Sequence, residues 1–132
     1  MTLNNAIGRV ELERPGEAQR TEMMVWIEQL DRRFWREHVL RHEGGASIPE
    51  PDYTDDADHE LLIPCPYDEI YIHHLYANID YRLGEIDRYN NSTILFQDAW
   101  KDACKAWRRE HMPLGAAIRH VIYGDGRKGG DM

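Results

Sequence analysis

The stretch that decides the fold runs from Glu17 to Arg41 and reads EAQRTEMMVWIEQLDRRFWREHVLR. Its large apolar side chains recur mostly at three- and four-residue steps, at Met23, Trp26, Ile27, Leu30, Phe34 and Leu40. This spacing is typical of a helix with one buried face. We therefore predict a long amphipathic helix over residues 17–41, ended by the pair Gly44-Gly45.

A second helix is predicted from Pro66 onward. Proline fits the first helical position, where its missing N–H costs nothing. Asp68 and Glu69 follow in the first turn, where the helix dipole favours negative charge, and Gly84 lies near the end. The expected buried stripe keeps helical spacing, at Ile72, Leu75, Tyr76, Ile79 and Leu83.

A third long helix is predicted after the turn signal Tyr89-Asn90-Asn91-Ser92, with Ser92 as its cap. Met112-Pro113 would stop this helix. Its apolar positions again follow one face, at Leu95, Phe96, Ala99, Trp100, Ala103 and Trp107.

The remaining segments are shorter or irregular. Thr2 can cap a short helix that reaches about Leu12, with Ile7 and Val10 on one side, before Pro15-Gly16. Residues 46–64 read as a long acidic loop, because prolines interrupt them and aspartates favour turns. Residues 114–123 can form one more short helix. We expect a mainly α fold, a small helical domain of three to five helices over residues 1–123, with a flexible C-terminal tail over residues 124–132.

Charge is distributed unevenly along the chain. The 132 residues carry a net charge of −8, which argues against a protein whose main work is gripping nucleic acid. Residues 42–81 contain no Lys or Arg but ten acidic residues, whereas residues 101–132 carry seven basic and four acidic ones. Such asymmetry can orient contacts between copies. Solvated acidic loops, and basic residues opposite a helix dipole, explain it equally well.

Little in the sequence points to catalysis. His38 and His42 are four residues apart, so both imidazoles of one helix could face a metal ion, but the sequence offers no clear third ligand. Cys65 and Cys104 do not make a disulfide framework, and we find no phosphate-binding or nucleophile motif. No apolar stretch approaches the roughly 20 residues of a membrane span. We expect a protein that is not an enzyme and uses no cofactor or metal, with a metal-dependent enzyme as an alternative.

Several motifs, in this order and spacing, resemble one family of small phage proteins. The strongest is the run from Leu61 to Tyr71, LLIPCPYDEIY. The others cover most of residues 2–113 and are residues 6–10, Pro15, residues 26–30, residues 79–81, residues 84–92, Phe96 and residues 109–113. Together they resemble the head–tail connector, or adaptor, proteins of long-tailed phages.

The resemblance implies a structural virion protein. Its copies would form a ring on the portal, generally of twelvefold symmetry, extend the DNA channel and offer a platform for the next neck or tail component. DNA would only pass through, no membrane would be involved, and assembly would take place in the cytoplasm of the bacterial host. A small packaging subunit that handles nucleic acid, similar to a terminase small subunit, is the alternative. The candidate contact residues are Asp52, Asp55, Asp56, Asp58, Tyr71, Arg108, Arg109 and Arg119.

Overall fold

The structure, a computed structural model, describes residues 1–54 and 58–112. Its helices are α1 (Leu3–Glu13), α2 (Arg20–Phe34), the π-helix η1 (Trp35–Val39), the 3₁₀ turn η2 (Gly45–Ser47), α3 (Ile70–Leu83) and α4 (Ile86–Glu110). The prediction of a mainly helical domain is confirmed. The predicted contact residues Asp55, Asp56 and Arg119, the short helix over 114–123 and the tail over 124–132 lie outside the described residues.

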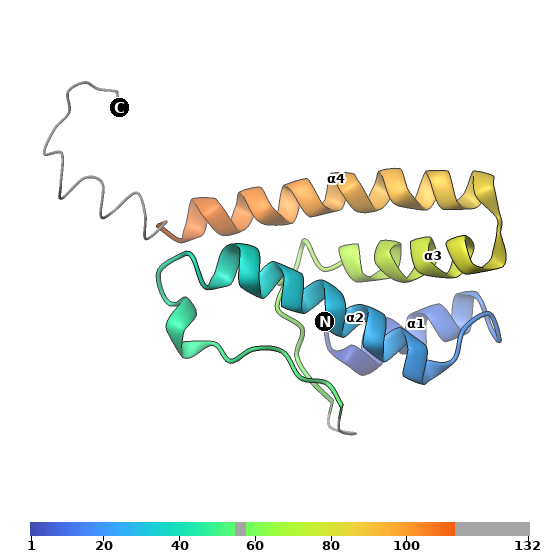
Figure 1. Ribbon diagram of the computed structural model, residues 1–132, viewed down its shortest axis with the longest axis horizontal. Coiled ribbons are helices and arrows are strands. Elements are labelled where there is room, and N and C mark those ends of the chain that lie inside the picture. The colour runs from blue at the N-terminus through green and yellow to red at the C-terminus, as the bar shows by residue number, and fades with distance from the viewer. Residues whose placement is uncertain (55–57, 113–132) are drawn as a thin grey trace, which may run out of the picture.

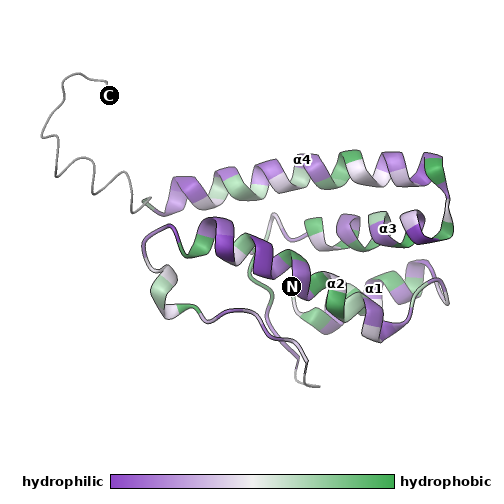
Figure 2. Ribbon diagram, in the orientation of Figure 1, coloured by the Kyte–Doolittle hydropathy of each residue, from purple (hydrophilic) through white to green (hydrophobic). Residues whose placement is uncertain are grey.

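The helices form two layers, one of α3 and α4 and one of α1 and α2. In Figure 1, α3 and α4 lie side by side as a hairpin, and α1 and α2 cover the other side of α3. Residues 48–54 and 58–60, the described parts of the acidic loop, extend away from α4. Hydrophilic and hydrophobic residues alternate along each helix in Figure 2, as expected of helices with one buried face. No helix of the described part is long and apolar enough to cross a membrane.

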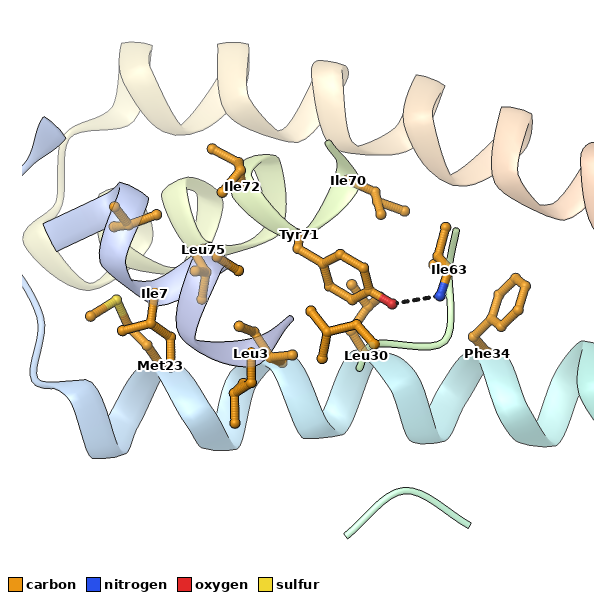
Figure 3. Close-up of a cluster of buried hydrophobic side chains, with 14 of the residues drawn as sticks. Leu3, Ile7, Met23, Leu30, Phe34, Ile63, Ile70, Tyr71, Ile72 and Leu75 are labelled. Atoms are coloured by element: carbon orange, nitrogen blue, oxygen red, sulfur yellow. Dashed lines mark hydrogen bonds between the residues drawn. The ribbon is translucent and has the colours of Figure 1, made fainter. Parts of the chain in front are cut away.

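The core lies between α1, α2, α3 and the short segment 61–63 (Figure 3). Leu3 and Ile7 of α1 meet Met23 and Leu30 of α2, and Leu75 of α3 closes the cluster. Burying each such side chain fully contributes roughly 1.5–3 kcal/mol. The apolar face predicted for α2 is therefore the centre of the domain.

The N-terminus is held as the sequence predicts. The Thr2 hydroxyl accepts the Asn5 N–H at 3.1 Å, and the Asn5 side chain accepts the Thr2 N–H at 3.2 Å. This reciprocal capping box satisfies donors that a helix start leaves free. The Leu3 N–H also donates to the His59 carbonyl at 2.8 Å, which ties α1 to the end of the acidic loop.

A π-helical turn corrects the predicted stripe of α2. The prediction placed Leu40 on the buried face, but Leu40 is 42% exposed whereas Val39 is fully buried. From Trp35 to Val39 the backbone bonds span five residues, as in the Leu40 N–H to Trp35 carbonyl bond of 3.0 Å. This wider turn rotates Val39 onto the face of Phe34.

The start predicted for α3 at Pro66 is four residues too early. Residues 65–69 form turns instead, in which the Tyr67 N–H donates to the Pro64 carbonyl at 2.9 Å. The Cys65–Pro66 bond is cis. Leu83, expected in the buried stripe, is 47% exposed because α3 ends beside it, at Gly84. Gly84 adopts φ +73°, a left-handed conformation that glycine accepts without a steric penalty.

The turn predicted at residues 89–92 does not exist. Gly84 already reverses the chain, and α4 runs unbroken from Ile86. Ser92 is buried inside α4, where its hydroxyl donates to Asp80 of α3 at 3.0 Å. Leu95, expected in the core, is 42% exposed. A tertiary contact has overridden the local preference of the Tyr-Asn-Asn-Ser run for a turn.

Candidate interaction surfaces

Three cations follow the outer side of α4. Lys101, Lys105 and Arg108 are exposed and separated by four and three residues. At about 100° per residue, all three lie about 140–160° around the helix axis from the buried Ala103. Among the described residues, none of the three forms an ion pair with a carboxylate. We call these residues the basic stripe.

A shallow groove runs beside the basic stripe, towards the C-terminal end of α2 and η1. The groove is lined by Glu37, His38, Trp100, Asp102, Cys104 and the stripe itself. Burial lowers the pKa of His38, and the positive charge of Arg108 lowers it further. Burial raises the pKa of the Cys104 thiol to about 11, so this cysteine is not a reactive thiolate at neutral pH.

Acidic residues gather on the loop that extends away from α4 (Figure 1). Glu50, Asp52, Asp58 and Glu60 are exposed there, and we call them the acidic loop face. Among the described cations, Arg36 pairs with Glu50 at 3.1 Å and the N-terminal amine pairs with Glu60 at 2.9 Å. The Asp58 carboxylate accepts the Asn4 N–H at 3.1 Å, near the start of α1. The loop thus carries four exposed carboxylates.

Three other acidic residues of the 42–81 segment, Asp68, Glu69 and Asp80, are paired with cations within the domain. Glu69 forms a bidentate pair with Arg9, at 2.7 and 2.5 Å, which lowers the Glu69 pKa. Asp68 lies 3.4 Å from the N-terminal amine. Asp80 is buried and accepts from Arg14 at 2.5 Å and Arg88 at 3.0 Å. The acidic middle of the sequence is thus not one surface, because these three carboxylates are paired inside the domain and do not face outward with the loop.

Tyr71, expected as a contact residue, is fully buried. Its hydroxyl donates to Asp31 at 2.6 Å and accepts the Ile63 N–H at 2.8 Å (Figure 3). The other Asp31 oxygen accepts from the Tyr53 hydroxyl at 2.6 Å and the Leu62 N–H at 3.2 Å. The prediction of Tyr71 as a surface residue is wrong, since this network fixes the end of the acidic loop to α2.

The two histidines proposed as metal ligands lie close together in an aromatic cluster. The ring centroids of His38 and His42 are 6.4 Å apart, and His38 packs against Phe34 and Trp100. The His42 Nδ1 faces the His38 carbonyl, which leaves Nε2 buried without a partner in the described structure. No group of three His, Cys, Asp or Glu side chains in residues 1–54 and 58–112 could hold a metal ion.

A second groove lies between α3 and α4. It holds about 630 Å³ and is lined by Tyr81, Tyr89, Phe96 and Trp100, with Arg33 at its edge. The Arg33 guanidinium lies 4.2 Å from the centre of the Trp100 ring, a cation–π contact. The sequence did not suggest this groove, because its aromatics fall partly within the segment that was expected to be a turn.

The contact residues predicted from sequence are only partly brought together. Arg108 joins the basic stripe, but Arg109 points elsewhere and donates to the Tyr67 hydroxyl at 3.2 Å. Asp52 and Asp58 share the acidic loop face. Lys101 and Lys105 are not among the predicted contact residues, although their spacing of seven and three residues from Arg108 indicates one face of a helix.

Comparisons with protein-family models, with curated proteins and with solved structures find no match to this chain.

Proposed function

We propose that this protein is a structural connector subunit, which forms a ring on a phage portal as part of the neck. The observation that carries the proposal is the polarity of the domain: the basic stripe lies on α4, whereas the acidic loop face lies on the segment that extends away from α4 (Figure 1). In a ring, every copy uses two different faces to contact its two neighbours. Faces of opposite charge suit that arrangement, because they favour one orientation and disfavour the reverse.

The residues that resemble the connector family make contacts that stabilise the helical fold. This supports the proposal that the chain shares the fold of that family. Ile63 and Tyr71 both lie within the strongest motif and belong to the network around Asp31. Gly84 ends α3, and Arg88 contacts the buried Asp80. None of these roles requires catalysis. We accordingly propose assembly, with the portal, further copies and the next neck component as partners and the virion neck as the location.

Binding to the portal tests this function directly. The portal protein encoded by the same genome is mixed with the purified chain, and the mixture is separated by size-exclusion chromatography. We expect the chain to co-elute with the portal assembly, in a ratio of about one copy per portal subunit. A chain that is folded by circular dichroism but elutes apart from the portal at all concentrations would contradict the proposal.

The basic stripe also favours a second candidate, a small packaging subunit that handles nucleic acid. Three unpaired cations on one helix can contact phosphates, although the net charge of −8 opposes binding. A gel-shift experiment with double-stranded DNA at low salt separates the two candidates. Binding that weakens steeply with salt and disappears in the variant K101E/K105E/R108E would support the packaging subunit, and no shift would remove it.

A further inference from the structure

We infer that neighbouring copies of this chain contact each other through the basic stripe of one copy and the acidic loop face of the next. The inference deepens the proposed connector function and rests on it for the closed ring. It names the two surfaces and gives the contact a direction along the ring.

The first argument is that the cations of the basic stripe form no ion pairs with the described carboxylates. Most cations of α1 and α2 that surround the core are paired, for example Arg9 with Glu69 and Arg33 with Glu37. Lys101, Lys105 and Arg108 have no such partner in the described structure. They present three positive charges over about 10 Å of helix, at 1.5 Å per residue. This surface suits a partner with several carboxylates.

The second argument is that the acidic loop face is held in place. The Pro51 carbonyl accepts from the Arg32 guanidinium at 2.9 Å, and the Tyr53 N–H donates to Glu28 at 2.6 Å. Tyr53 itself is buried, with its hydroxyl on Asp31. Glu50 directly precedes Pro51, Asp52 lies between Pro51 and Tyr53, and both acidic side chains are exposed. Their position is thus fixed before a partner arrives, which lowers the entropic cost of association.

The third argument is geometric. Within one copy, the C-terminal part of α2 and η1 lie between the loop and α4 (Figure 1), and no ion pair joins the two surfaces among the described residues. Two copies can satisfy both surfaces, and each contact leaves one stripe and one loop face free for the next copy. Such a contact propagates head to tail and forms a ring when the angle between copies closes.

A complementary charge reversal tests the contact. One variant, K101E/K105E/R108E, reverses the stripe. The other, E50K/D52K, reverses the outer part of the loop face and spares Asp58 and Glu60, which contact the N-terminal residues before and in α1. On the portal, we expect each variant alone to lose ring formation by at least tenfold. An equimolar mixture should recover it, because every contact can then join one copy of each kind around an even-numbered ring.

The conservative variant K101R/K105R/R108K is the matched control and should assemble like the unaltered chain, since it keeps all three charges. Circular dichroism and the thermal midpoint verify that every variant folds. Full assembly of both reversed variants, or no recovery in the mixture, would overturn the inference. So would DNA binding lost in the stripe variant together with normal rings in the loop variant.

A measurement without the portal separates this inference from the proposed function. Analytical ultracentrifugation at low salt should show self-association of the unaltered chain. This association should weaken in 1 M salt, because the Debye length there is only about 3 Å and the charges of the two surfaces are screened. Either reversal should abolish it and the mixture should restore it. Self-association that is lost in each variant and restored in the mixture, without any binding to the portal, would support the contact between copies and contradict the connector function. Portal rings that ignore both reversals would keep the connector and reject the contact. No association in either experiment would overturn both.

Discussion

Two aspartates, among the described residues, are fully buried, and their surroundings compensate the charge in different ways. Asp80 accepts from two arginines and from Ser92. Asp31 has only hydroxyl and backbone N–H donors, from Tyr53, Tyr71 and Leu62. Burial consequently raises the pKa of Asp31, while its donors oppose that shift. Each carboxylate joins segments far apart in the chain, so both specify the fold.

Tyr71→Phe should destabilise the domain by about 2 kcal/mol, because the change leaves buried polar groups on Asp31 and Ile63 without a partner. Tyr81→Phe is the matched control. Its ring is 71% exposed, so its free energy of unfolding should change by less than about 0.5 kcal/mol. Urea unfolding of both variants measures the difference. Equal stability of the two would contradict the assigned role of the buried network.

His74 should make the domain less stable in mild acid. Burial lowers its pKa to about 4, below the 6.5 of an ordinary histidine, and its Nε2 faces the Trp26 carbonyl at 2.9 Å. Since the unfolded state binds the proton more readily, the stability contribution is complete above pH 6.5 and is lost as the pH falls towards 4. The full loss is on the order of 3 kcal/mol.

Proton NMR of the histidine rings, followed from pH 7.5 to the onset of unfolding, measures this shift directly. We expect the His74 ring to remain neutral while an exposed histidine in an unfolded peptide of the same sequence titrates. A His74 ring that titrates near 6.5 in the folded protein would contradict the burial described for it.

At the scale of elements, the sequence predicts helix existence well and helix boundaries less well. Thr2 and the apolar stripes at Met23, Ile27 and Leu75 carry purely local information, and the structure confirms them. The π-helical turn, the turns at 65–69 and the continuity of α4 depend on tertiary contacts. Ser92 is the clearest case, since its partner Asp80 lies on another helix.

Val39→Ala tests the π-helical turn. Val39 is fully buried, so its truncation should cost about 2 kcal/mol, within the range for large-to-small changes in a core. Leu40→Ala removes a larger side chain that is 42% exposed and should cost less than about 0.5 kcal/mol. Thermal or urea unfolding compares the two. A greater loss of stability for Leu40→Ala would contradict the π-helical turn and favour the regular helix that the sequence predicts.

At the scale of the whole molecule, the structure narrows the charge asymmetry of the sequence to two surfaces. The sequence could predict an acidic middle and a basic C-terminal region, but not which charges are cancelled inside the domain. Glu69 and Asp80 are paired with arginines from distant helices. The unpaired stripe on α4 and the acidic loop face remain. Charge summed along the chain cannot make this distinction, because it depends on which segments meet.

Electron microscopy of the portal mixed with this chain tests the central claim most directly. The account predicts an added ring on the portal with one copy per portal subunit, in which the outer side of α4 faces the loop of the neighbouring copy. A portal that stays bare in the presence of excess, correctly folded protein would contradict the account.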